Sequence, residues 1–400
     1  MHIKKRALTK NLIIVFVLLY SIMPVVGRLV SSTMSTYFYM MVLLIAVAFV
    51  VFASARKSLN WNVYLILPFV AWQLLQMFIT SESVLVWGYQ ALLACVPILL
   101  GAYVVQYRRA EINFYSKLIV VAYLTTIITT IIGLQQYPDA ARWLATASSS
   151  AEAKLILYEW KNIGGYSFVY SVVLLYPLLI FAYKQKKVGT GFTVCMSVGI
   201  FILLIMAEYT TALLLFLITT ILFFVKRNLT GKEVIALIVV TVLLCVVFSD
   251  HVSAFFTFLG DKLNNKNFSE RLYALAGGKQ GLETAEDNRL ELYTMSLNTF
   301  LSKPLFGTFL SGGYGSGGHS FILDALAQFG ALGATILYFM YKRIYVVFYR
   351  PLKDKPGYGY LLWAFVQAIL LSCINTGMWL EVLTLYIPVL VYAMYGKVEE

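Results

Sequence analysis

The side chains best suited to chemistry lie in one stretch late in the chain. A glycine-rich run from Gly312 to Gly318 leads directly to His319, and a membrane-length apolar segment follows. A histidine whose pKa is near neutrality can take a proton from a hydroxyl at physiological pH. The glycines would let a ligand approach the backbone closely. We therefore expect His319 to be catalytic or ligand-binding; the alternative is a polar residue that caps the following helix.

Two charged residues near His319 are weighed with it. Arg289 precedes an apolar stripe in the same polar region. Its planar guanidinium suits a pyrophosphate, because it can bond two oxygens at once and keeps its charge; an exposed surface arginine is the alternative. Asp324 lies five residues after His319, about 140° around a helix, so we do not expect it to orient the imidazole directly.

Other charged residues are weaker candidates. Arg271, Lys161 and Arg142 fall in polar loops and could help to bind an anionic lipid headgroup. Glu208 and Glu381 lie near the ends of apolar segments, where a carboxylate is costly and often functional, although an interfacial position also explains them. The sequence shows no metal-type spacing of Cys and His and no nucleotide-binding loop. We therefore expect no metal and no cofactor.

The rest of the chain must be a membrane scaffold that positions these residues. Of its 400 residues, 60% are hydrophobic and only 12% are charged, whereas soluble domains carry about 25% charge. The mean hydropathy is +0.79. The net charge of +12 does not indicate nucleic-acid binding, because most Lys and Arg residues fall on one predicted side of the membrane.

Apolar segments of about 20 residues predict the membrane spans. There are twelve, at 11–30, 35–55, 61–80, 84–105, 115–133, 166–183, 192–207, 210–225, 233–249, 319–341, 358–374 and 380–396. One kinked helix over 192–225 is the alternative, but it would place the basic cluster from Lys342 to Lys355 outside, against the positive-inside rule. We therefore expect an all-α polytopic bundle, one membrane domain over 1–400, with both termini in the cytoplasm.

Two long outside loops interrupt this pattern, at 134–165 and 250–318. Loops longer than about 15 residues are usually functional or disordered. The second loop contains a predicted amphipathic helix over 285–303, which Thr284 would cap and Pro304 would end. We expect this helix to lie on or near the membrane surface; a helix that simply caps the bundle is the alternative.

The segment from Arg289 to Gly333 also carries a family resemblance. An arginine and an amphipathic stretch are followed by Lys303-Pro304-Leu305-Phe306-Gly307, a glycine-rich run, His319-Ser320-Phe321 and Ala327-Gln328-Phe329-Gly330-Ala331-Leu332-Gly333. This order resembles the bacterial O-antigen ligase and polysaccharide polymerase superfamily. The motif covers about 45 residues, and the topology pattern covers the whole chain.

The resemblance implies a Wzy-type polymerase of capsule, O-antigen or exopolysaccharide. Such an enzyme would be a metal-independent glycosyltransferase at the outer face of the bacterial plasma membrane, acting on undecaprenyl-pyrophosphate-linked oligosaccharide. It would have membrane lipid around it, a flippase and a chain-length regulator as partners, and no nucleic acid. His319 matches the family's general base, and Arg289 matches its pyrophosphate-binding arginine.

One position departs from the family pattern. Members often carry a second arginine at an earlier hinge, but here that hinge is Glu208-Tyr209-Thr210-Thr211. Arg142, Lys161 or Arg271 would then have to supply the second positive charge. A ligase that transfers lipid-linked glycan to another acceptor is the nearest alternative function. A polysaccharide flippase or transporter is the other, although the first five spans carry few polar residues for such a role.

Overall fold

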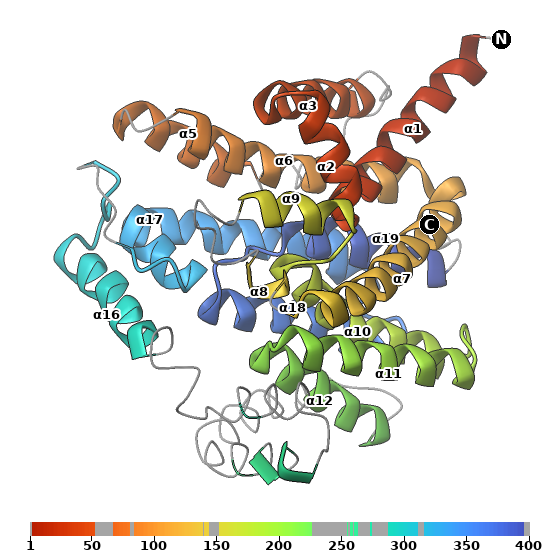
Figure 1. Cartoon of the computed structure of the whole chain (residues 1–400). Coiled ribbons are helices and arrows are strands. Elements are labelled where there is room, and N and C mark those ends of the chain that lie inside the picture. Colours follow the sequence, from red (N-terminus) through yellow and green to blue (C-terminus); the bar gives the residue numbers. More distant parts are fainter. Residues whose placement is uncertain are drawn as a thin grey trace.

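A computed structural model of the chain describes seven main stretches and a few isolated residues between 254 and 273. The stretches are 2–52, 67–80, 84–138, 140–143, 152–225, 287–310 and 316–395. Every regular element in these stretches is a helix, as Figure 1 shows. The all-α prediction is therefore confirmed for the described part of the chain. The predicted span 233–249, Thr284 and most of the large outside loop lie outside it.

Several of these helices are apolar enough to cross a membrane. Four described stretches meet the length and composition of a span: Arg109–Gln136, Tyr166–Lys184, Thr190–Ala207 and Phe321–Leu352. They contain α7 (Ile112–Gln136), α10 (Tyr166–Lys184), α11 (Thr190–Ala207) and α17 (Phe321–Ile344). The other apolar helices are α1 (His2–Ile22), α2 (Pro24–Thr33), α3 (Thr36–Phe52), α5 (Pro68–Thr80), α6 (Val84–Tyr107), α12 (Thr210–Val225), α18 (Tyr358–Ile374) and α19 (Ile387–Tyr395). A membrane protein is thus supported, while the count of twelve spans stays a prediction.

The first apolar segment is bent rather than straight. The chain turns by 108° between α1 and α2, although the sequence pattern predicted one span over 11–30. Pro24 opens α2, where its missing N–H and fixed φ are tolerated. The next amide, Val25 N–H, donates to the Asn162 side chain at 3.3 Å. A distant loop therefore caps α2 after the bend.

The helices α11 and α12 form a hairpin. Glu208, which follows α11, has a left-handed backbone with φ 60°. Phe201 and Phe216 lie at similar distances in sequence on either side of this hinge, and their rings are 6.2 Å apart. The two helices therefore run back along each other, which confirms two separate helices and excludes the single kinked one.

The helix α17 is interrupted at Gly330, where φ is 63° and ψ is −168°. The amides of Ala331 and Leu332 cannot bond within the helix there. They donate instead to the carbonyls of Pro304 (2.8 Å) and Leu305 (3.3 Å). In return, Thr308 N–H donates to the Ala327 carbonyl at 2.9 Å. The turn that begins at Pro304 thus fills a gap in α17, which the sequence pattern had predicted as continuous over 319–341.

Gly330→Ala should destabilise the fold. A Cβ at Gly330 would lie 2.3 Å from the Leu305 carbonyl oxygen, and a backbone with φ 63° and ψ −168° is essentially reserved for glycine, which costs another residue about 1–3 kcal/mol. Thermal unfolding of the purified protein in detergent should show a lower Tm by several degrees. Gly199→Ala in α11 is the matched control, because nothing lies within 4 Å of a Cβ there. Equal Tm values for the two variants would contradict the docked turn.

Candidate functional site

His319 lies in a short segment that leads into α17. Ser320, not His319, caps that helix, because its Oγ accepts a hydrogen bond from Leu323 N–H at 3.2 Å. Gly318 turns the chain with φ 73°, a conformation that suits glycine. His319 itself is exposed. The capping alternative for His319 is therefore wrong, and its imidazole remains accessible for a reaction.

Asp324 fixes the backbone on both sides of His319. Its Oδ1 accepts hydrogen bonds from Ser296 Oγ (2.7 Å) and Gly318 N–H (3.2 Å), and its Oδ2 accepts one from Ser320 N–H (3.3 Å). Ser296 Oγ also accepts a bond from Gly317 N–H at 2.8 Å. As expected, Asp324 is not seen to orient the imidazole directly. Sequence reasoning missed its role, because Asp324 lies four residues after the serine cap and not at the third position that the capping box uses.

The helix α16 (Asp287–Ser302) packs against this segment, as Figure 1 shows at one end of α17. A Cβ at Gly317 would lie 2.2 Å from the Leu292 carbonyl oxygen, so the two backbones are in close contact. Arg289 precedes Leu292 by three residues, which is less than one helical turn of about 5.4 Å. The structure therefore brings the backbones of Arg289 and His319 to the same corner of the fold.

A helix that simply caps the bundle would bury its apolar face, but α16 buries a polar residue and exposes apolar ones. Its buried contact is polar, since Ser296 is only 1% exposed. Leu297 and Leu301 belong to the predicted apolar stripe, yet they are 44% and 64% exposed. Of the predicted helix over 285–303, the structure confirms 287–302 as a helix, and the protein does not bury these two leucines of its stripe. An apolar surface of this kind suits contact with lipid.

A loop after α18 is bonded to this corner of the fold. Phe321 N–H donates to the Asn375 carbonyl at 2.9 Å, and Tyr293 Oη donates to the Ile374 carbonyl at 3.2 Å. Further along, Tyr341 Oη donates to the Met378 carbonyl at 3.0 Å. The position of this loop is therefore fixed by bonds from α16 and α17.

Four aromatic side chains continue from that loop to the hairpin hinge. Tyr170 lies 5.6 Å from Trp379 and 5.4 Å from Tyr209, measured between ring centroids. Tyr166 contacts all three of these rings. Tyr209 Oη donates to the carbonyl of Ala141 at 2.7 Å. This aromatic cluster joins α10, the hinge and the short helix α8 (Ala140–Trp143).

The predicted binding residues fall into separate places. The backbones of Glu208 and Arg142 adjoin the Tyr209–Ala141 bond, so the structure brings these two positions together. Lys161 donates to Gln136 Oε1 at 3.2 Å and lies 4.7 Å from the centre of the Tyr137 ring. These contacts hold it against the end of α7. Arg271 lies outside the described residues, as do the side chains of Arg142 and Arg289.

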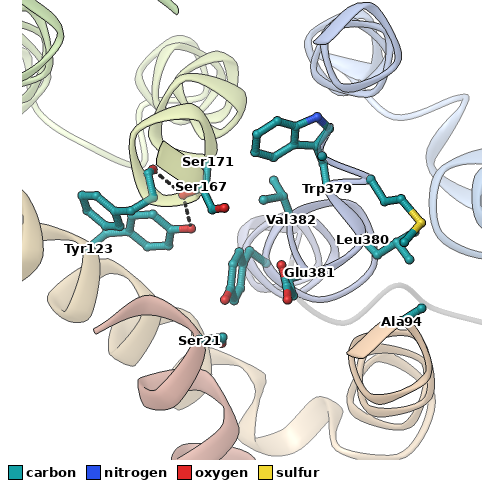
Figure 2. A pocket seen from close by; sticks show the side chains of 13 residues that line it. Ser21, Ala94, Tyr123, Ser167, Ser171, Trp379, Leu380, Glu381 and Val382 are labelled. Atoms are coloured by element: carbon teal, nitrogen blue, oxygen red, sulfur yellow. Dashed lines mark hydrogen bonds between the residues drawn. The ribbon is translucent and has the colours of Figure 1, made fainter. Parts of the chain in front are cut away.

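A cavity of about 210 Å³, with a carboxylate and several hydroxyls among its lining side chains, lies beside the aromatic cluster. Figure 2 shows the Glu381 carboxylate among the side chains of Ser21, Ser171 and Trp379. The sequence placed Glu381 at a hinge, but it gave no sign of the cavity because its walls come from five distant parts of the chain. Among the described residues, no group of three His, Cys, Asp or Glu could hold a metal ion.

A charged pair links α2 to α9 (Glu152–Trp160). Arg28 of α2 and Glu159 of α9 are 3.7 Å apart between Nη1 and Oε2. Asn162 follows with φ 55° and donates to Thr129 Oγ1 at 3.0 Å. Burial raises the pKa of the Glu159 carboxyl above 4.5, and Arg28 offsets part of that rise.

Asp324→Ala should loosen the His319 segment. The substitution removes the acceptor for Gly318 N–H, Ser320 N–H and the Ser296 hydroxyl. We expect a lower Tm, and a rate of His319 modification by diethyl pyrocarbonate that differs from wild type by more than about twofold. The Tm and the modification rate of Asp324→Asn should lie between those of wild type and Asp324→Ala, since an amide keeps one oxygen acceptor. An unchanged rate in a stable Asp324→Ala protein would show that the network does not position His319.

The Glu159 carboxyl should make stability depend on pH. Because the folded-state pKa is raised, the folded protein binds this proton more tightly than the unfolded chain. The stability of wild type relative to Glu159→Gln should therefore fall as pH rises from below 4.5 through the raised pKa. Thermal unfolding of both proteins between about pH 4 and pH 7 measures this difference. A relative stability that rises with pH would mean that pairing with Arg28 outweighs burial.

No family model, curated protein or solved structure matches the chain.

Proposed function

We propose that this protein is a Wzy-type polymerase that joins undecaprenyl-pyrophosphate-linked oligosaccharide units at the outer face of the plasma membrane. The supporting observation is the corner where an exposed histidine, held on both sides by Asp324, lies beside the helix that carries Arg289. The transfer needs a base at the attacking hydroxyl and a positive charge at the leaving pyrophosphate. The order of residues from Arg289 to Gly333 supports the same family.

The proposed reaction is a single displacement. His319 takes the proton from a hydroxyl on the terminal sugar of one unit, and that oxygen attacks the anomeric carbon of the other unit. The new glycosidic bond forms as the bond to pyrophosphate breaks, and undecaprenyl pyrophosphate leaves with the electron pair. The Arg289 guanidinium would stabilise the negative charge on the leaving group. The displacement inverts the anomeric centre and needs no metal.

A second positive charge for the pyrophosphate would come from Arg142. The family's second arginine is replaced here by the hinge at Glu208, and the Tyr209–Ala141 hydrogen bond places α8 against that hinge. Lys161 is less suited, because it already contacts Gln136 and Tyr137. Arg271 remains a sequence candidate. A flippase would supply the lipid-linked units, and a chain-length regulator would limit the polymer.

A ligase for lipid-linked glycan is the second candidate, because the same histidine and arginine could serve another acceptor. The bent pair α1–α2 also resembles the broken spans of transporters, but the described spans offer no chain of charged residues across the membrane. Polymer length separates polymerase from ligase directly.

Deletion of the gene should leave single lipid-linked repeat units, and wild type should restore the polymer ladder on a gel. His319→Ala, at normal abundance in the membrane, should restore no ladder, because a general base contributes about 10²–10⁴-fold to the rate. His251→Ala, in the same outside loop, is the control. A full ladder with His319→Ala would exclude His319 as the base. Polymer of normal length that stays attached to its lipid carrier in the deletion strain would favour the ligase.

A further inference from the structure

The cavity around Glu381 is assembled from helices far apart in the sequence. Ser21 lies at the end of α1, Ala94 belongs to α6, Tyr123 to α7 and Ser171 to α10. Figure 2 shows Glu381 in the middle of these side chains. The walls enclose about 210 Å³, which is room for several waters or one sugar ring.

Two residues that line the cavity, Trp379 and Tyr386, have a buried polar atom without a hydrogen-bond partner. No ion pair joins Glu381 to a basic residue in the described part of the chain. Trp379 is only 6% exposed, and its indole Nε1–H has no hydrogen-bond partner. Buried polar groups are normally paired, so each exception needs an explanation, such as an absent ligand.

The backbone at the cavity is also irregular. Trp379 has φ 55°, a left-handed conformation that is strained for a bulky residue. A π-helical turn, Val382–Tyr386, follows Glu381 directly. Strained residues and π-helical turns concentrate at functional sites. The local backbone thus holds Glu381 and Trp379 together, although the left-handed conformation of Trp379 is strained.

The chemistry of the lining favours a neutral, hydroxyl-rich ligand. The carboxylate and the serine hydroxyls can pair with sugar hydroxyls, and the Trp379 ring can pack on the apolar face of a sugar. A divalent cation would need several oxygen ligands from carboxylates, and the described residues hold no acidic cluster here. A phosphate would be repelled by Glu381.

We propose that this cavity binds a sugar ring of the glycan substrate, with the Glu381 carboxylate accepting hydrogen bonds from its hydroxyls. This inference rests on the proposed polymerase function and gives it a site for glycan. The loop 375–379 connects the two places, since the Asn375 carbonyl bonds α17 beside His319 while Trp379 lines the cavity. Occupancy of the cavity would therefore act directly on the loop that borders the catalytic corner.

The test uses wild-type protein in detergent and a hydrophobic carbodiimide, which modifies buried carboxyls. Mass spectrometry would follow the labelling rate of Glu381, with Glu159 as the internal control. The probe is the repeat-unit glycan released by mild acid from glycolipid of the deletion strain; undecaprenyl phosphate is the control ligand. Saturating glycan should slow labelling of Glu381 by more than about twofold, while the control ligand and Glu159 should show no change. Labelling that is unaffected by glycan would overturn the proposal.

Variants in cells provide the second measurement. Glu381→Gln keeps the side-chain volume but weakens the acceptor, so it should shorten the polymer ladder at normal protein abundance. Glu159→Gln, outside the cavity, should leave the ladder unchanged. A full ladder with Glu381→Gln would overturn the glycan site. A deletion strain with normal polymer would instead refute the polymerase function, so the two failures are distinguishable.

Discussion

The fold depends on satisfying the backbone where α17 is broken. Lipid offers no hydrogen bonds, so every amide and carbonyl at membrane depth needs a partner within the protein. At Gly330 the turn from Pro304 supplies those partners for Ala331 and Leu332. The turn directly follows α16, so the same bonds fix where α16 ends. Two helices that the sequence treats as separate are thereby locked into one unit, and both predicted catalytic residues belong to it.

Within this unit, Asp324 performs the local positioning. A single carboxylate can accept several hydrogen bonds, and here three donors converge on it from α16 and from both sides of His319. The imidazole can thus remain exposed while its backbone is held on both sides. An accessible base on a fixed backbone is the arrangement that proton transfer from a bulky, hydrophilic acceptor requires.

Much of this could be predicted from local sequence. Long apolar runs predicted the helices, Pro304 predicted the end of α16, and the turn residues at Glu208 predicted the hinge between α11 and α12. The breaks inside predicted spans, after Ile22 and at Gly330, were not foreseen. Proline and glycine are tolerated in apolar helices when a distant segment satisfies the freed amides, and such partners, Asn162 and Pro304 here, cannot be identified from local pattern.

In the candidate site, too, the partners that are distant in sequence could not be identified from local pattern. His319 and Arg289 stand out because their residue types and surroundings suit chemistry, whereas helical geometry argues against a direct role for Asp324. Helical geometry separates the Asp324 side chain from the His319 side chain, but the observed hydrogen bonds run from backbone N–H groups on either side of His319 to Asp324. An interfacial position was the simpler interpretation of Glu381, because it lies at a predicted hinge between two spans, yet serines from α1 and α10 surround it.

Glu381 has no ion pair with a basic residue in the described part of the chain, and the buried indole N–H of Trp379 beside it has no hydrogen-bond partner, which is costly. The fold nevertheless keeps Glu381 beside a strained tryptophan, on the loop that also borders His319. A ligand that contacts both Glu381 and Trp379 would offset that cost. Its binding would affect the catalytic corner through the hydrogen bond from Phe321 N–H to the Asn375 carbonyl.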